Sequence, residues 1–548
     1  MPLQTPREAA MTRDCQTILQ QAIAAVEPYQ AIHQNVHCTP QGELSMTGTR
    51  QVYNLYNYDT IQIVAFGKAS SGMATALVQV LQTALHPDRQ QQQQQKSPSI
   101  QGLVIVKDQH ATPDEIDTLT QHNIAVYEAA HPVPDARSVA ASQQLLQLLQ
   151  DDKNDNKSHE EETHTSKLVI VCISGGGSAL FCTPHDNLSL QNLQDTNQAL
   201  LQSGMSIQEM NVIRKKLEVG KGGGLAEAVF QRNEMSISGK HSPLNHKNHA
   251  LVSLILSDVL GDPLDLIASG PTVPDSSTWQ DAWKLVQQNN LHADGKHALP
   301  KAVLQHLQEG LEREQQNDMT TTTTAAASSS FRKATTTCLV GNNALAVQQA
   351  ARTAAKLGYE PRVLGTRFQG EARDFAEFLV AMAEHVQQPA FDEYGLVAAT
   401  DEHGNVENKK PVALIAGGET TVTIPTDCSG KGGRNQELAL TAAVAMTSKR
   451  HASGLEPLRN VVIASAGTDG TDGPTDAAGA IVDGGTLMRL QQEGEASVGE
   501  AAIEALRNHD AYHFLDQTDQ NGRSPLIRTG PTGTNVADVM IALIDRKQ

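Results

Sequence analysis

Short apolar runs that stop abruptly at a polar turn recur along this chain and limit the folds open to it. Residues 251–256 form one such run, which stops at Ser257 and Asp258. A run of this length suits a strand that is covered on both faces. Comparable runs lie at residues 61–66, 102–106, 168–173, 412–416 and 461–464. Because segments with helical spacing lie between several of these runs, the sequence predicts βαβ units, a parallel sheet and an α/β fold.

The chain has 548 residues, more than a single hydrophobic core usually serves, so two domains are expected. We predict an N-terminal domain over residues 1–310, with a Rossmann-like parallel sheet in a three-layer arrangement, and a C-terminal α/β domain over residues 331–548. Residues 535–544 are predicted to form a last helix that packs back on the N-terminal domain.

Five polar segments are predicted to be disordered surface insertions, because they contain too little apolar surface to offset the entropy lost on ordering. They lie at residues 90–95, 151–162, 231–249, 320–330 and 399–410. The Thr/Ala/Ser tract at 320–330 also marks the expected domain boundary.

Composition excludes some classes of function. The formal net charge of −19 argues against a nucleic-acid surface, although it still permits a basic pocket for an anion. The six cysteines form no CxxC pair, which favours reduced core thiols over disulfides or zinc ligands. No apolar stretch approaches the roughly 20 residues that span a bilayer, and no signal peptide is recognised. We expect a cytoplasmic protein, with a short mitochondrial transit peptide as the alternative.

Two loops near predicted strand ends are candidates for binding an anion. One consists of Ser174, Gly175, Gly176, Gly177 and Ser178, which follow the strand at 168–173. Glycines let the backbone approach an anion, and a helix N-terminus would direct N–H groups at it. The alternative is a flexible turn.

The other loop holds Lys68, which follows the strand at 61–66 and lies between a glycine and an alanine. A lysine there suits a phosphate as a point charge, unless it is simply solvated beside a helix start. Asp258 likewise either faces a ligand at the carboxyl edge of the sheet or caps the next helix.

A further glycine-rich loop runs into the apolar helix predicted at 438–446. Its candidate ligand-binding residues are Gly432, Gly433, Arg434, Asn435 and Glu437. The arginine suits bidentate binding of a phosphate or carboxylate.

The loop that follows the strand at 461–464 contains Asp469, Asp472 and Asp476. These either bind a divalent cation, although their spacing is not that of an EF-hand, or form a hydrogen-bonded turn framework. The chain contains no P-loop motif, no dinucleotide-binding fingerprint and no protein-kinase signature, which argues against those classes.

Nine short motifs occur in order along most of the chain. They are Phe-Gly-Lys-Ala-Ser (66–70), His-Pro-Val-Pro-Asp (131–135), Ile-Ser-Gly-Gly-Gly-Ser-Ala-Leu (173–180), Ile-Arg-Lys-Lys-Leu (213–217), Ser-Asp-Val-Leu-Gly-Asp (257–262), Ile-Ala-Ser-Gly-Pro-Thr-Val-Pro-Asp (267–275), Gly-Gly-Glu-Thr-Thr-Val (417–422), Gly-Gly-Arg-Asn-Gln-Glu (432–437) and Gly-Thr-Asp-Gly-Thr-Asp-Gly-Pro-Thr-Asp-Ala-Ala-Gly-Ala (467–480). Together they resemble the class II glycerate 2-kinases, whose C-terminal part is the MOFRL domain.

This resemblance implies ATP-dependent phosphorylation of D-glycerate to 2-phosphoglycerate with Mg²⁺, by two α/β domains with an active site in the cleft between them. The matched positions make Lys68, Asp258 and Arg434 the principal catalytic candidates, with Asp262 as a candidate metal ligand. The loop 174–178 would hold either the substrate carboxylate or the nucleotide phosphates. D-glycerate and ATP are then the partners, with no nucleic acid or membrane, and a homodimer is compatible with the sequence.

Two other functions are considered. Hydroxypyruvate reductase is a name sometimes attached to relatives of this family, although the chain lacks a dinucleotide-binding fingerprint. A non-catalytic sensor of small molecules would keep the same fold, and it would bind glycerate and ATP without forming a product.

Overall fold

The computed structural model describes residues 4–85, 97–150, 166–230, 249–292, 295, 297–318, 335–387, 410–425, 428–490, 498–518 and 522–546. The chain forms two compact units. Pro28–Val340 make up the parallel-sheet unit, and Met1–Glu27 together with Gly341–Gln548 make up the mixed-sheet unit. The predicted insertions lie outside the described residues, except for His249 and Lys410.

The parallel-sheet unit is built around a six-stranded sheet. Its strands follow the order β6 (Ile124–Ala129), β5 (Ser99–Lys107), β4 (Thr60–Phe66), β7 (Lys167–Ile173), β8 (Ala250–Leu256) and β9 (Thr335–Gly341). Neighbouring strands from β6 to β8 are parallel. The predicted α/β class, with its parallel sheet, is confirmed.

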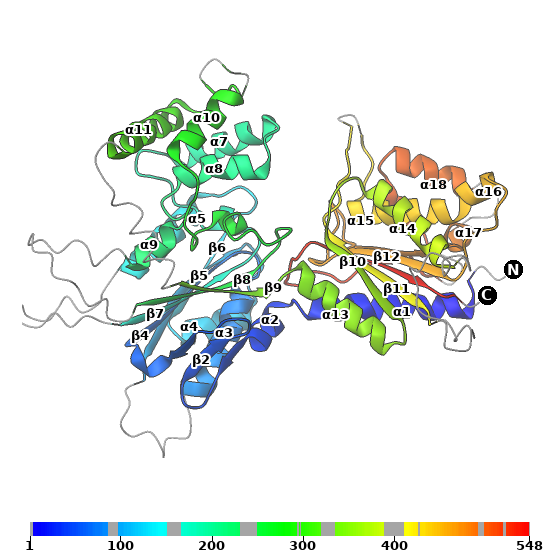
Figure 1. The fold of residues 1–548 in the computed structure, drawn as a ribbon, viewed down its shortest axis with the longest axis horizontal. Coiled ribbons are helices and arrows are strands. Elements are labelled where there is room, and N and C mark those ends of the chain that lie inside the picture. The colour runs from blue at the N-terminus through cyan, green and yellow to red at the C-terminus, as the bar shows by residue number, and fades with distance from the viewer. Residues whose placement is uncertain are drawn as a thin grey trace, which may run out of the picture. The chain divides into compact units, whose positions relative to one another are not determined.

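Helices cover both faces of this sheet. α3 (Ser70–Leu85) and α4 (Pro113–Gln121) lie on one face, and α5 (Ala136–Gln150) lies on the other (Figure 1). Leu145 and Leu149 of α5 pack against apolar side chains of β4, β5 and β7. Strands covered in this way are apolar on both sides, which is why residues 61–66 and 251–256 are nearly unbroken apolar runs.

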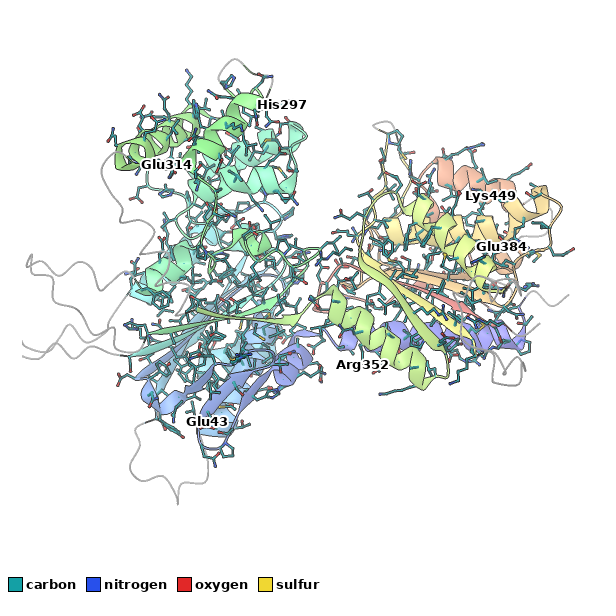
Figure 2. The ribbon with its side chains drawn as sticks, viewed as in Figure 1. Glu43, His297, Glu314, Arg352, Glu384 and Lys449 are labelled. Carbon is teal, nitrogen blue, oxygen red and sulfur yellow. The ribbon has the colours of Figure 1, made fainter. Side chains whose placement is uncertain are left out.

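A helical layer extends the parallel-sheet unit. Its main helices are α7 (Leu190–Gln202), α8 (Ile207–Leu217), α10 (Trp279–Gln288) and α11 (Lys301–Asp318), which share one apolar core. Glu314 of α11 accepts hydrogen bonds from the backbone N of Trp279 (3.1 Å) and Gln280 (2.9 Å), so it caps the start of α10 (Figure 2). A small antiparallel sheet comprises β1 (Val36–Cys38), β2 (Glu43–Met46) and β3 (Val52–Asn54).

The mixed-sheet unit contains a second six-stranded sheet. Its order is β10 (Glu360–Phe368), β11 (Val412–Gly418), β15 (Asp538–Ile544), β12 (Val461–Gly467), β13 (Gly479–Asp483) and β14 (Leu526–Ile527). Only β10 and β11 pair in parallel; the other pairs are antiparallel. α1 (Pro6–Ala24) and α13 (Asn343–Lys356) lie on one face, and α14 (Ala372–Gln387) and α15 (Arg434–Val444) lie on the other (Figure 1).

The prediction of a helix at residues 535–544 is wrong. Residues 538–544 form the strand β15, which lies between β11 and β12 inside the mixed sheet. Every residue of β15 is buried. A short apolar run carries no helical period by itself, and this run has the length and two-sided burial of a central strand. The last regular element is therefore a central strand of the mixed sheet and not a helix.

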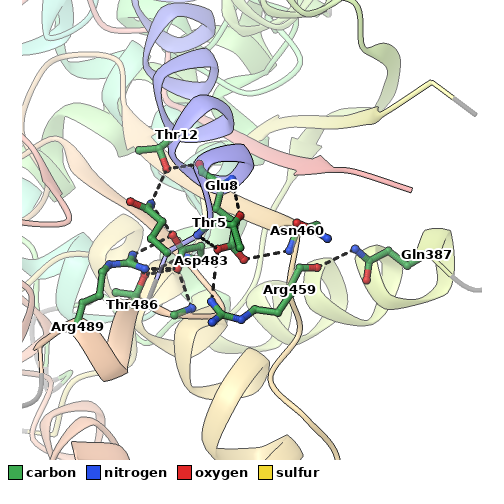
Figure 3. Close-up of polar contacts among 11 residues, drawn as sticks. Thr5, Glu8, Thr12, Gln387, Arg459, Asn460, Asp483, Thr486 and Arg489 are labelled. Carbon is green, nitrogen blue, oxygen red and sulfur yellow. Dashed lines mark hydrogen bonds and ion pairs between the residues drawn. The ribbon is translucent and has the colours of Figure 1, made fainter. Parts of the chain in front are cut away.

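The N-terminal helix α1 packs within the mixed-sheet unit, whereas the predicted domain range 1–310 places it with the parallel sheet. Its capping box joins Thr5 and Glu8, and Glu8 is fully buried. The Glu8 carboxylate accepts hydrogen bonds from the backbone N of Thr5 (2.8 Å) and Asn460 (3.1 Å) and pairs with Arg459 at 3.4 Å (Figure 3). These contacts join residues 4–24 to the segment that enters β12.

All six cysteines are free in the structure, and four of them are buried. No helix among the described residues is long and apolar enough to cross a membrane.

We predict that Glu8→Ala lowers the free energy of unfolding by about 2 kcal/mol, because it leaves the part-buried N–H of Asn460 without its acceptor and removes the cap of α1. Chemical denaturation followed by circular dichroism measures the loss. Asp117→Ala, at an exposed site on α4, is the matched control and should change stability little. Equal effects of the two substitutions would contradict the anchoring role.

Candidate active site

Three loops leave the parallel sheet from the same edge. Phe66 at the end of β4 is in register with Ile173 at the end of β7, and Ile173 is in register with Ile255 in β8. The backbone N of Lys68 donates to the carbonyl of Gly175 (2.8 Å), and the backbone N of Ala69 donates to Oγ of Ser174 (3.0 Å). The loop after β4 is thus fixed to the loop after β7.

Glycines in the second loop allow side chains to approach its backbone. A Cβ on Gly175 would lie 2.3 Å from Oδ2 of Asp258. A Cβ on Gly176, whose φ is +81°, would lie 2.8 Å from Cδ2 of His131 and 3.4 Å from Cγ of Lys68. Two of the three predicted catalytic residues, Lys68 and Asp258, therefore adjoin the same predicted glycine loop.

Burial and charge perturb the acid–base groups of this cluster. Burial raises the pKa of the Asp258 carboxyl, and the positive charge of Lys68 partly opposes this rise. Burial lowers the pKa of His131 to about 4, and the charges of Lys68 and Lys107 add to the effect. Near neutral pH, His131 is therefore an uncharged hydrogen-bonding group, while Asp258 holds a proton more readily than an ordinary aspartate.

The helix expected after Ser178 is shorter than the pattern suggested. α6 spans only Gly177–Leu180, so it offers a single turn rather than an extended helix N-terminus. A Cβ on Gly177 would lie 2.9 Å from the Cβ of Ala268, so this glycine serves close packing. Oγ of Ser178 lies 3.1 Å from Oγ of Ser269, at hydrogen-bonding distance.

Asp262, the predicted metal ligand, lies in the turn beyond β8. Its φ is +56°, and its backbone N donates to the carbonyl of Val259 (3.1 Å). Across the described part of the chain, no three His, Cys, Asp or Glu side chains form a group that could hold a metal ion. The role of Asp262 stays a prediction.

In the mixed-sheet unit, Arg434 is the first residue of α15. Its Nε donates to Oδ2 of Asp538 (2.6 Å) and its Nη2 to Oδ1 (2.9 Å), while its Nη1 lies 3.1 Å from the Glu419 carboxylate. Asp538 is fully buried, and burial raises the pKa of its carboxyl, an effect that Arg434 opposes. The bidentate pair fixes the guanidinium at the wall of a pocket.

This pocket has a volume of about 680 Å³. It is lined by four of the predicted residues, Gly432, Gly433, Arg434 and Glu437, and by side chains that include Glu419 and His509. The carboxylate of Glu437 pairs with Arg373 (2.6 Å) and with Nδ1 of His509 (3.1 Å).

The fifth predicted residue, Asn435, is fully buried and supports Arg434 from behind. Its Nδ2 donates to the Oδ1 atoms of Asp538 (3.0 Å) and Asp472 (3.2 Å), and its Oδ1 accepts a hydrogen bond from Ser465 (2.5 Å). Both buried acids are thereby tied to the first turn of α15.

The aspartate-rich loop 467–476 forms a hydrogen-bonded framework, one of the two alternatives for it. Asp472 accepts from the backbone N of Asn435 (3.2 Å) and Gln436 (2.8 Å), so it caps α15. Asp469 accepts from the backbone N of Thr471 (3.1 Å), and Asp476 pairs with Arg528 (3.1 Å).

Several residues of these two sites were absent from the predicted set. His131 lies in the His-Pro-Val-Pro-Asp motif, which was the available signal. The sequence does not indicate Asp538 as a site residue, because a helix is predicted for its segment. His509 and Arg373 have no local sequence signal, since both reach Glu437 from distant segments.

Most of this chain is similar in sequence to known proteins. Residues 14–238 and 239–308 match a domain of unknown function termed DUF4147, and residues 412–538 match the MOFRL family. A D-glycerate 2-kinase of Thermotoga maritima is 35% identical over 89% of this chain and 91% of its own length. The chain belongs to the class II glycerate 2-kinase family.

A solved structure, described as a glycerate kinase of Thermotoga maritima, has the same fold as this chain. The two superpose with a TM-score of 0.69 and are 32% identical, and the match covers 98% of this chain and 100% of the solved chain. A relative from Agrobacterium vitis, provisionally named a hydroxypyruvate reductase, is 32% identical over 88% of this chain and 98% of its own length. The family predicted from the nine motifs is confirmed.

We predict a pH-dependent stability that depends on Asp472. Burial raises its pKa from 3.8 to about 7. The folded chain therefore binds this proton more tightly than the unfolded chain does, and the contribution of Asp472 to stability falls as the pH rises from about 4 to about 7. Asp472→Asn removes the titration, so the difference in unfolding midpoint between pH 5 and pH 8 should shrink.

Thermal denaturation at the two pH values measures this difference. Asp476→Asn is the control, because ion pairing and hydrogen bonding lower the pKa of that exposed carboxylate and it stays ionised at both pH values. A pH dependence equal to that of the unaltered chain in Asp472→Asn would contradict the assignment.

Proposed function

We propose that this chain is an ATP-dependent D-glycerate 2-kinase. The observation that carries the proposal is the position of Lys68 and Asp258 against one glycine loop at the carboxyl edge of a parallel sheet. The names of its kinase relatives support the choice of D-glycerate as acceptor. In the reaction, the C2 oxygen of D-glycerate bonds to the γ-phosphorus of ATP as the bond to the β–γ bridging oxygen breaks, and the products are ADP and 2-phosphoglycerate.

Asp258 is proposed to accept the proton of the C2 hydroxyl. A buried carboxylate is a stronger base than an exposed one, and burial raises the pKa of this group. Lys68 is proposed to place its charge on the transferring phosphoryl group, where developing charge needs neutralisation. Because His131 is uncharged, it would orient a substrate oxygen without repelling the ammonium group of Lys68.

The pocket beside Arg434 is proposed to bind ATP. Its volume of about 680 Å³ falls within the range of roughly 300–1,000 Å³ that is typical of sites for small molecules. Gly432 and Gly433 expose backbone to a phosphate, and Arg434, held by Asp538, would neutralise phosphate charge. The residues Asn435 and Glu437 would act indirectly, through the buried acids and His509.

Mg²⁺ is proposed to enter with the nucleotide. The ion commonly uses one or two carboxylates together with phosphate oxygens, so Asp262 fits it as a single protein ligand. When bound, Mg²⁺ would neutralise charge on the phosphates. We further propose that the enzyme is a cytoplasmic homodimer, with mitochondria as the alternative location; sedimentation velocity and cell fractionation test these two points.

Incubation with ATP, Mg²⁺ and D-glycerate should yield 2-phosphoglycerate and ADP, resolved from 3-phosphoglycerate by phosphorus NMR. A 3-phosphate product would overturn the regiochemistry. Oxidation of NADH with hydroxypyruvate would favour the reductase, and saturable binding of D-glycerate and ATP without product would favour a sensor.

Two substitutions test the acid–base centre. Asp258→Asn should lower kcat by about 10²–10⁴-fold, the range for loss of a general base. Gly175→Ala should lower it by at least about tenfold, because the new methyl group would displace the Asp258 carboxylate from 2.3 Å away. Gly72→Ala in α3 is the control, since its methyl group meets only side-chain atoms at 3.2 Å or more. Full activity in Gly175→Ala would refute this placement of Asp258.

A further inference from the structure

A small cavity lies beside the glycine loop of the parallel-sheet unit, distinct from the surroundings of Lys68. Its volume is about 80 Å³. Polar side chains line it: Ser178, Asn197, Arg214, Glu218 and Lys221. Since a buried water needs roughly 10–15 Å³, the cavity has room for a group of a few atoms but not for a nucleotide.

Two of the charged residues in its wall neutralise each other. Lys221 and Glu218 form a buried ion pair. The second oxygen of Glu218 accepts from the backbone N of Thr183 (3.0 Å), and Nζ of Lys221 also donates to the carbonyl of Ser178 (2.9 Å). Both residues thus have hydrogen-bonded partners of their own, and neither forms an ion pair with the third charged group of the cavity.

That third charge is the guanidinium of Arg214. Its Nε donates to Oδ1 of Asn197 (2.7 Å), and no carboxylate of the described residues lies within ion-pairing distance of it. Burial lowers its pKa, an effect that the charge of Glu218 partly offsets. A half-buried guanidinium without an anion is costly unless a ligand supplies one.

The neighbours of Arg214 on α8 differ from it in this respect. Lys215 pairs with Asp265 (3.2 Å), and Lys216 pairs with Asp275 (2.8 Å). Of the three consecutive basic residues 214–216, only the arginine lines the cavity and lacks an acidic partner among the described residues. Its planar fork also matches a carboxylate better than an ammonium group does.

The cavity is connected to the proposed catalytic cluster by two short segments. Gly175 and Gly176 adjoin Asp258 and His131, whereas Ser178, at the other end of the same loop, lines the cavity. Pro132 and Pro134, which follow His131, line it as well. A ligand group in this cavity thus contacts the loop against which Asp258 and His131 lie.

We propose that this cavity binds the carboxylate of the hydroxy-acid substrate and that Arg214 is the residue that selects for it. The inference rests on the proposed function for the identity of the acid. Arg214 would donate its two outer nitrogens to the carboxylate, with Asn197 holding the guanidinium in plane. An alcohol or amide without the negative charge would leave Arg214 uncompensated and would bind weakly.

The first test is kinetic. Arg214→Met should raise KM for D-glycerate about 10- to 100-fold, as expected for loss of a charge-assisted hydrogen-bonded pair, while KM for ATP stays within twofold. Arg214→Lys should keep part of the affinity, and Asn197→Ala should show a smaller rise. Lys284→Met, at an exposed site on α10, is the control and should have no effect. If Arg214→Met folds poorly, the other two variants carry the test.

The second test measures binding without turnover. D-glycerate alone should raise the melting temperature of the unaltered chain, glyceramide should not, and the shift should vanish in Arg214→Met. Unchanged KM values in the variants would overturn the inference, as would equal stabilisation by glyceramide. Unchanged KM with loss of the shift would make the cavity a second, non-catalytic D-glycerate site and overturn its assignment to the reacting substrate. Failure of the proposed function would instead appear as no phosphorylated product from the unaltered chain.

Discussion

The hydrogen bond from the backbone of Lys68 to the carbonyl of Gly175 is the contact on which the rest of the parallel-sheet site depends. It joins two loops whose strands already end in register, so the position of one side chain determines the position of the next. Asp258 and His131 can lie against this junction only because the loop residues there have no Cβ. Lys68, the partly buried Asp258 and the neutral His131 are therefore held together by backbone geometry rather than by ion pairs.

In the mixed-sheet unit, buried carboxylates rather than glycine contacts hold the site residues in place. Two buried carboxylates, Asp472 and Asp538, lie beneath the first turn of α15, and their hydrogen bonds go to Arg434, Asn435 and backbone N–H groups. Both acids are buried, and their shared hydrogen bonds hold the start of α15 and the arginine together. In both units the carboxyl groups whose pKa is raised by burial lie beside glycine-rich segments, which suits sites that bind anions close to the backbone.

Much of this arrangement is predictable from local pattern. The apolar runs at 61–66 and 251–256 indicate buried strands, and Lys68 and Asp258 follow from their places at strand ends. Long-range partners were not predictable. Residues 538–544 read as a strand only when β11 and β12 flank them, and the place of α1 follows from the burial of Glu8 against Asn460. Arg214 stands in a run of three basic residues, and only the structure shows that its two neighbours form ion pairs, whereas no acid among the described residues pairs with it.

The mixed-sheet unit is built from two separate segments of the chain, and this affects folding during translation. α1 is synthesised before the segment Pro28–Val340, whereas its partner strands follow that whole segment. At roughly 5–20 residues per second, ribosomes need about 15–60 s to translate that segment. Throughout this interval the apolar stripe of α1, which includes Met11, Ile18 and Leu19, has no native surface to cover it. Apolar surface that stays exposed in this way makes a nascent chain prone to aggregation until its partner strands are made.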